Sequence, residues 1–299
     1  MYYSSFEEIV SQAEKISSRT VMAVPAADEH SIEAALMAAE RNIVEPVFIG
    51  NVEEINSVLA KNGRPCRVIE APDPAEAAGK AVAMVRSGEA GFILKGNLDT
   101  KVILKEVVNK EHGLSTGRIM SHFTIFQIPN YHKLIAIVDG GMMTYPNLEQ
   151  KADIIRNTVE VFLKLGYEKP KVGVLACVEK LNPKMPETVD GDALKTMCLN
   201  GEIENCIVEG PISYDCAVSA ELAAFKKYES PCAGDCDILL VPNIHAGNFL
   251  GKMITVTAGG QMAGFIVGAK CPIAMTSRGS SIEEKFISIV LAALAAGEN

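Results

Sequence analysis

The stretch Cys271–Phe286, which reads CPIAMTSRGSSIEEKF, joins a short apolar run to the start of a helix. The apolar part ends at Thr276 and is typical of a short buried strand. Small and polar residues follow, and serine and glutamate then recur at the spacing of a helical capping box. We therefore predict a strand, a turn and a helix in that order, with the helix over Ile282–Ala296.

The same order of strand, turn and helix recurs along the chain. Short runs rich in β-branched residues predict strands, and helical periodicity follows most of them. The predicted strands are Val21–Ala26, Pro46–Ile49, Gly91–Leu94, Ser121–Ile128, Lys133–Val138, Lys171–Cys177, Cys206–Glu209, Asp237–Val241 and Gly264–Gly268, and two further predicted helices are Glu33–Asn42 and Lys101–Lys110. This alternation favours an α/β fold with mostly parallel sheets that helices cover on both faces.

So many strands exceed the roughly four to six of one ordinary sheet, and we therefore predict two α/β domains. The first would comprise residues 1–125 plus 269–299, and the second residues 126–268. The apolar runs 121–128 and 133–138 lie too close together for strict alternation. They fit either a hairpin or a crossing between the domains. The last helix would pack back onto the first domain.

Composition and charge exclude several classes of protein. The 299 residues carry a formal net charge of −9 without a long Lys/Arg run, which disfavours binding to nucleic acid. No uninterrupted apolar run reaches the roughly 20 residues that a membrane span needs. The N-terminal sequence lacks a secretory signal, and with eight cysteines this favours the reducing cytoplasm. Cys232 and Cys236 are spaced too widely for a typical zinc pair, so we predict structural thiols and no metal.

Several enzyme signatures are missing from the sequence. The pairs Gly79-Lys80 and Gly251-Lys252 are not followed by Ser or Thr, as a P-loop requires. No GxGxxG motif follows the first predicted strand, and neither GxSxG nor HExxH occurs. These absences disfavour dinucleotide-binding, serine hydrolase and zinc protease functions.

The turn before the last helix has the chemistry of an anion site. A helix N-terminus presents free N–H groups and a partial positive charge. Arg278 would add a planar guanidinium group that suits phosphate. The same residues also fit an ordinary capped helix in which Arg278 is only solvated, and the segment alone leaves both readings open.

Short motifs occur in a fixed order along the chain. They are Lys95-Gly96-Asn97-Leu98-Asp99-Thr100, Asn109–Leu114, Thr116-Gly117, Met120-Ser121-His122, Asn182–Thr188, Glu209-Gly210-Pro211, Val241-Pro242-Asn243-Ile244, Gly247-Asn248 and Ser277-Arg278. In this order they resemble the motifs of the phosphate acetyltransferases and phosphate butyryltransferases, and an unrelated fold would have to reproduce all of them. The resemblance covers nearly the whole chain and is closer to the butyryltransferase branch in the stretches NPKMPET and MSH.

The resemblance implies a two-domain fold like that of isocitrate and isopropylmalate dehydrogenases, with the active site in the interdomain cleft. It implies an acyltransferase that moves a short acyl group, butyryl for this branch, between coenzyme A and phosphate in a ternary complex. Coenzyme A would be a substrate, and no cofactor is implied. The family also implies a homodimer or a higher homo-oligomer.

The resemblance also implies roles for matched residues. Arg278 would bind the phosphoryl group, Ser277 would hydrogen-bond the reacting oxygens, and Glu284 would be the general base for the coenzyme A thiol. The acetyl branch commonly has Asp at that position. Glu283 is the alternative base, and both glutamates also fit a helix cap. The other implied substrate-binding residues are Lys95, Gly96, Asn97, Thr100, Asn243, Gly247, Asn248, Gly279 and Ser280.

Three other functions fit the sequence less well. One is a phosphate acetyltransferase, which has the same chemistry with a smaller acyl group. The second is a metal- and NAD-dependent dehydrogenase of the same fold, but we see no clear Asp cluster or dinucleotide motif. The third is a non-catalytic sensor of acyl-CoA, since a fold does not guarantee activity.

Overall fold

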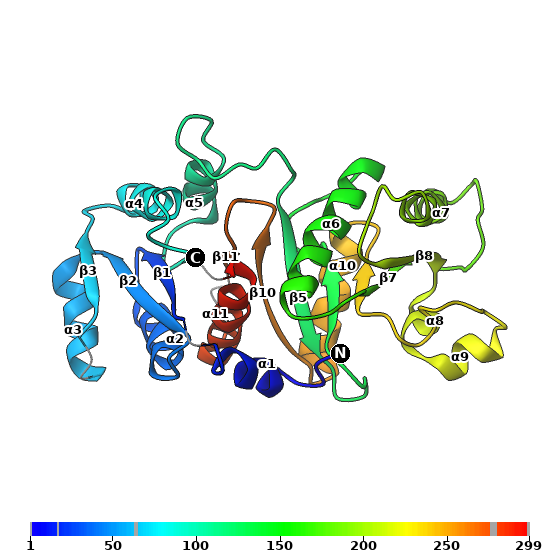
Figure 1. Ribbon diagram of the computed structural model, residues 1–299, viewed down its shortest axis with the longest axis horizontal. Helices are drawn as coiled ribbons and strands as arrows, with labels where there is room; N and C mark the ends of the chain where they lie inside the picture. The colour runs from blue at the N-terminus through cyan, green and yellow to red at the C-terminus, as the bar shows by residue number, and fades with distance from the viewer. Residues whose placement is uncertain (1, 17, 63–64, 276–279, 298–299) are drawn as a thin grey trace. The chain divides into compact units, whose positions relative to one another are not determined.

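The computed structural model describes residues 2–16, 18–62, 65–275 and 280–297 (Figure 1). Ser277, Arg278 and Gly279 therefore lie outside the described residues. The chain forms two compact units. The first unit comprises residues 7–118 and 263–299, and the second comprises residues 1–6 and 119–262. The predicted domain boundaries at 125/126 and 268/269 stay a prediction.

The first unit contains a parallel sheet in the order β3-β2-β1-β4-β11 (Figure 1). β10 adds an antiparallel strand beside β11. The elements are α1 (Phe6–Ala13), β1 (Thr20–Pro25), α2 (Glu29–Glu40), β2 (Val44–Gly50), α3 (Val52–Asn62), β3 (Arg67–Glu70), α4 (Pro74–Arg86), β4 (Phe92–Leu94), α5 (Thr100–Val107), β10 (Gln261–Val267), β11 (Ile273–Ala274) and α11 (Ile282–Ala296).

Within the second unit the strands follow the order β5-β6-β9-β7-β8. β5 and β6 are antiparallel, and the remaining neighbours are parallel. The elements are β5 (Ser121–Gln127), β6 (Ile135–Val138), α6 (Leu148–Lys164), β7 (Lys171–Leu175), α7 (Pro186–Leu199), β8 (Ile207–Ile212), α8 (Tyr214–Val218), α9 (Ala220–Phe225), β9 (Ile238–Leu240), α10 (Ile244–Lys252) and the π-helix η1 (Met253–Thr257). Of the two readings of the runs 121–128 and 133–138, the antiparallel hairpin is confirmed.

Helix α11 has the predicted bounds and packs against α2, β4 and β11 of the first unit. Every residue from Lys285 to Ala295 is buried, which is expected for a helix that is apolar almost all round. The prediction that the last helix packs onto the first part of the chain is confirmed.

Helix α2 starts four residues before the predicted Glu33, because Asp28 caps it. The Asp28 carboxylate accepts a 2.8 Å hydrogen bond from Ser31 N, and Ser31 Oγ accepts one of 2.9 Å from Asp28 N. The helix ends at Glu40, since Asn42 takes a left-handed φ of 59° and closes a Schellman motif.

Strand order determines which turns meet in the first unit. From β1 the chain winds outward to β2 and β3, whereas β4 lies on the other side of β1. The order of the strands therefore reverses between β1 and β4. In open α/β sheets, ligands bind at the carboxyl ends of the strands beside such a reversal. The turns that follow Pro25 and Leu94 occupy that position.

Candidate functional site

The turn after β4 packs closely against the turn after β1. Gly96 N donates to Pro25 O at 3.1 Å, and Asn97 N donates to Ala26 O at 2.7 Å. A Cβ atom at Gly96 would lie 2.2 Å from the Ala26 carbonyl oxygen. Only glycine therefore allows this approach, which explains why Gly follows Lys95 at the carboxyl end of β4.

Lys95 folds back over its own turn. Its Nζ donates hydrogen bonds to Gly96 O at 3.1 Å and to Leu98 O at 2.8 Å. The side chain is half-buried, whereas Asn97 and Thr100 are exposed. The structure thus brings together Lys95, Gly96 and Asn97 on one turn, and Thr100 begins the helix that follows it.

The start of α11 carries the capping box that the sequence predicts. Ser281 Oγ accepts a 3.1 Å hydrogen bond from Glu284 N, and Glu284 Oε2 accepts one of 3.1 Å from Ser281 N. Ser280 is buried and Glu283 is exposed. Glu284 therefore has a structural task as a cap, and its role as a base stays a prediction.

Three predicted residues meet in the second unit at the start of α10. Asn243 is the N-cap, and its Oδ1 accepts 3.1 Å hydrogen bonds from His245 N and Ala246 N. A Cβ atom at Gly247 would lie 2.7 Å from the Cα of Gly140, so the helix touches the turn after β6. The exposed Asn248 reaches the same turn, with its Nδ2 3.5 Å from Gly140 O.

That turn is held by Asp139, which sequence reasoning missed. The Asp139 side chain is buried, and its carboxylate accepts four hydrogen bonds from main-chain N–H groups. The donors are His122 N at 2.8 Å, Gly141 N at 2.8 Å, Met142 N at 2.8 Å and Met143 N at 3.3 Å. An Asp-Gly-Gly sequence directly after a predicted strand was the signal that could have found this turn.

His122 lies beside Asp139 at the amino end of β5. Burial lowers the pKa of His122, and the negative charge of Asp139 only partly opposes this effect. The imidazole is therefore neutral at pH 7, and its Nδ1 lies 3.0 Å from Thr124 Oγ1. A Cβ atom at Gly141 would lie 2.4 Å from that ring nitrogen, so the turn also packs on the histidine.

A second group of polar side chains follows β7 and β8. Among the described residues, the possible metal ligands Glu179, Asp215 and Cys216 place their ligand atoms within 4.8 Å of one another. Lys226 Nζ already lies 2.9 Å from Glu179 and 2.8 Å from Asp215. Hydrogen bonds from Lys226 and Ser213 lower the pKa of Asp215 to about 2. The ammonium group thus supplies the positive charge that these carboxylates need.

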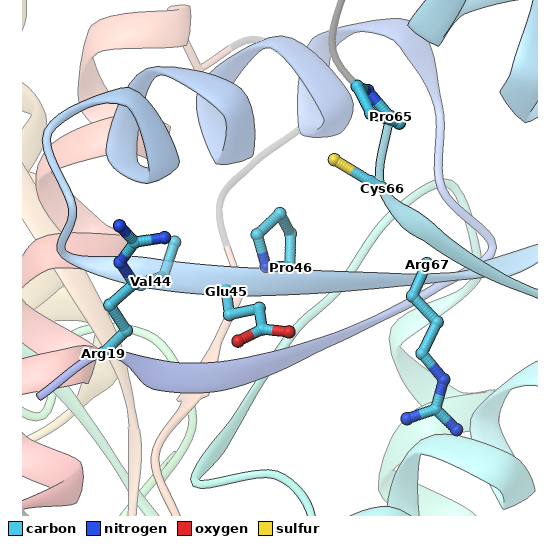
Figure 2. A pocket seen from close by; sticks show the side chains of 7 residues that line it. All are labelled: Arg19, Val44, Glu45, Pro46, Pro65, Cys66 and Arg67. Carbon is cyan, nitrogen blue, oxygen red and sulfur yellow. The ribbon is translucent and has the colours of Figure 1, made fainter.

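A surface hollow of about 390 Å³ lies in the first unit near the amino ends of β2 and β3. It is lined by Arg19, Val44, Glu45, Pro46, Pro65, Cys66 and Arg67. Figure 2 shows Arg19 and Arg67 on either side of Glu45. Arg67 is paired with Glu89, and Arg19 Nη2 lies 2.5 Å from Asn42 Oδ1. The hollow contains no predicted site residue and lies at the strand ends opposite to Lys95.

Cys232 and Cys236 are buried within an apolar cluster of the second unit, with Cys236 Sγ 3.3 Å from Cys232 O. The hydrogen bond with the neighbouring Cys232 and burial raise the pKa of Cys236, so this thiol is protonated. None of the described helices combines the length and the hydropathy that a membrane span needs.

Both units place predicted site residues at the carboxyl ends of strands, where ligands bind in open α/β sheets. Comparison with known proteins identifies the family. The sequence model of the phosphate acetyl/butaryl transferase family matches residues 75–293. The chain therefore belongs to this family of acyltransferases, and the predicted resemblance is confirmed.

Two relatives show how far the similarity extends. The chain is 38% identical over 296 residues to a phosphate butyryltransferase of Clostridium acetobutylicum, with 98% of both chains covered. It is 40% identical over 277 residues to a phosphate acetyltransferase of Thermotoga maritima, with 91% of this chain and 94% of the relative covered. Both branches of the family are therefore similar to this chain over most of its length.

Solved structures agree with the fold. A branched-chain phosphotransacylase from Enterococcus faecalis superposes with a TM-score of 0.81 at 30% identity, covering 94% of this chain and all of the other. A 4-hydroxythreonine-4-phosphate dehydrogenase from Klebsiella pneumoniae shares the fold alone, with a TM-score of 0.55 at 14% identity over 93% of this chain and all of the other. The predicted dehydrogenase-like α/β fold is confirmed.

Proposed function

We propose that this chain interconverts a short-chain acyl-CoA and inorganic phosphate with an acyl phosphate and coenzyme A, and that butyryl is the preferred acyl group. The observation that carries this proposal is the 38% identity to a phosphate butyryltransferase over 98% of both chains. Similarity of that extent leaves no domain of the relative without a counterpart in this chain.

The proposed reaction is a direct transfer within a ternary complex. In one direction, the thiol sulfur of coenzyme A attacks the carbonyl carbon of the acyl phosphate. The bond from that carbon to the phosphate oxygen breaks, and the thiol proton passes to a base. A thiol has a pKa near 8.5, so a base raises the fraction that can attack. Holding both substrates together removes much of the entropic barrier, and no covalent enzyme intermediate is required.

Residues of the first unit would bind the phosphate and supply the general base. Arg278 would bind the phosphoryl group, Ser277 would donate to the reacting oxygens, and Glu284 would accept the thiol proton. The described neighbours support this assignment, because Lys95 N donates to Ala274 O at 2.9 Å at the end of β11. The Lys95-Gly96 turn thus lies beside the strand that leads to these residues.

Residues of the second unit would bind the remainder of the substrate. Asn243 uses its Oδ1 to cap α10, so the group it would offer to a substrate is its amide nitrogen. Asn248 is exposed on the same helix and would donate from its amide as well. Gly247 would allow the first turn of α10 to lie close to Gly140, since a side chain at Gly247 would displace Gly140. Such fixed donors stabilise an oxyanion or a carbonyl group without reorganisation.

A phosphate acetyltransferase is the second candidate, because the chain is also 40% identical to one. In both cases coenzyme A is a substrate and no further cofactor takes part. We also propose that the enzyme is cytoplasmic and acts as a homodimer or a higher homo-oligomer, as the family resemblance implies.

The test is to mix the purified protein with butyryl-CoA, phosphate and a chelator, and to follow the release of free thiol. We expect phosphate-dependent release that is faster with butyryl-CoA than with acetyl-CoA. Faster release with acetyl-CoA would support the acetyltransferase. Loss of release on chelation, or equal release without phosphate, would contradict the proposed chemistry.

A further inference from the structure

The Asp139 carboxylate is buried, and in the described part of the chain it accepts hydrogen bonds from main-chain N–H groups. Burying an ionised carboxylate costs several kcal/mol unless hydrogen bonds replace its water. Four N–H donors surround it here. These hydrogen bonds replace the water that the carboxylate loses on burial. They also hold the turn in its conformation.

This carboxylate joins two segments of the second unit. Its Oδ2 accepts from His122 N at the start of β5 and from Met143 N, whereas its Oδ1 accepts from Gly141 N and Met142 N. The amino end of β5 lies beside the carboxyl end of β6 because the two strands are antiparallel. Asp139 therefore fixes the whole turn after β6 relative to the amino end of β5.

The turn after β6 also contacts helix α10. The backbone of Gly140 lies so close to Gly247 that neither position can carry a side chain without displacement. Asn248 Nδ2 lies 3.5 Å from Gly140 O. A shift of the turn must therefore move the first turn of α10 or the amide of Asn248.

We propose that Asp139 is a positioning residue that sets the Asn248 amide for the acyltransfer reaction, by holding Gly140 against the first turn of α10. This inference rests on the proposed function, in which Asn248 contacts the substrate. Asp139 itself does not touch the substrate. Its effect passes through the Gly140 carbonyl and the backbone contact with Gly247.

Asp139→Asn is the informative substitution because it keeps the size of the side chain. An amide has a single acceptor oxygen, so one of the two pairs of N–H donors must face an NH₂ group. The turn must then shift or lose hydrogen bonds. A displacement of about 1 Å at a reacting group costs up to about a hundredfold in rate.

The experiment measures kcat and KM for the wild type, Asp139→Asn, Asn248→Ala and the double variant. We expect each single variant to lower kcat/KM by about 10- to 100-fold with the same division between kcat and KM. We expect the double variant to be no worse than the poorer single variant, because both act through one amide. Additive losses, or unchanged kinetics in either single variant, would overturn the inference.

Asp237→Asn is the matched control, since Asp237 is a buried carboxylate of the same unit at the amino ends of the strands. We expect it to lower the melting temperature and to leave kcat/KM unchanged. If Asp139→Asn does not fold, Asp139→Glu replaces it in the same cycle, with a smaller loss that is again not additive with Asn248→Ala. A wild type without phosphate-dependent thiol release would refute the proposed function instead, so the two failures are distinct.

Discussion

Lys133 Nζ and Asp237 Oδ1 form a 2.6 Å ion pair between two side chains that are both buried. The pair lies where β6, β7 and β9 begin, at the strand ends opposite to Asn243. Asp237 Oδ2 also accepts a 2.7 Å hydrogen bond from Lys171 N. This end of the sheet therefore has a structural task that is separate from the expected chemistry.

Replacement of Lys133 by Met should strongly destabilise the protein. Removing one partner of a buried ion pair leaves an unpaired charge, which costs about 3–5 kcal/mol. Urea unfolding measures this loss as a lower free energy of unfolding. Lys171→Met is the control, because the Lys171 side chain is more exposed and pairs with the half-exposed Asp235. Equal losses for the two variants would contradict the special role of Lys133.

Stability should fall in acid through Asp235. Burial raises the pKa of Asp235, but hydrogen bonds from Lys133, Lys171 and His132 outweigh it and hold the pKa well below its usual range. A depressed pKa in the folded state contributes stability above the unfolded pKa of about 3.9, and this contribution is lost as the pH falls further. Unfolding free energies measured from about pH 6 to pH 2 should therefore decrease less steeply in Asp235→Asn than in the wild type.

Local signals explain which elements the sequence predicts well. α11 has the predicted bounds because the Ser281–Glu284 box and a long apolar run are both local. β3 was missed because this edge strand has only half-buried or exposed residues and no apolar run. The bounds of α2 were wrong because the capping pair Asp28–Ser31 was not recognised.

Strand order explains what the sequence could not predict about the site. Asp139 accepts from His122 N, a main-chain group 17 residues away that carries no sequence signal. Gly140 and Gly247 meet because β6 and β9 are neighbours, although two other strands separate them along the chain. The residue types were visible in the sequence, but their pairing depends on strand order.

Gly96→Ala should disrupt the turn after β4. The new Cβ would lie 2.2 Å from Ala26 O, so the backbone must move. This movement would displace the turn that we expect to bind the substrate. We expect lower stability and a loss of at least about tenfold in kcat/KM. Gly79→Ala within α4 is the control, because the nearest atom to its new Cβ would be a carboxylate oxygen of Glu106 at 3.9 Å. This variant should stabilise the protein by about 0.5–1 kcal/mol. Wild-type kinetics in Gly96→Ala would remove this turn from the proposed site.

Arg278→Ala should lower turnover by about two to three orders of magnitude, since it removes a charge contact to the transferred phosphate. The melting temperature should stay close to that of the wild type. Arg118→Ala is a control that removes one positive charge at an exposed position outside the proposed site. Unchanged turnover in Arg278→Ala would refute the assignment of the phosphate site.

Glu284→Gln separates the two tasks of Glu284. Glutamine also fits the capping box, so the hydrogen bond from Ser281 N is preserved and α11 should keep its stability. The variant cannot accept the thiol proton, so kcat should fall by about 10²- to 10⁴-fold and its pH dependence should flatten. Glu284→Ala would lose the cap as well, at a cost of about 0.5–2 kcal/mol in unfolding free energy.

The matched control is Glu283→Gln on the neighbouring exposed residue. If Glu284 is the base, Glu283→Gln keeps wild-type kinetics while Glu284→Gln loses activity at unchanged stability. If the pattern is reversed, Glu283 is the base and Glu284 serves only as the cap. Because both variants keep the side-chain size and remove one charge each, a difference between their pH–rate profiles can arise only from the position of the carboxylate.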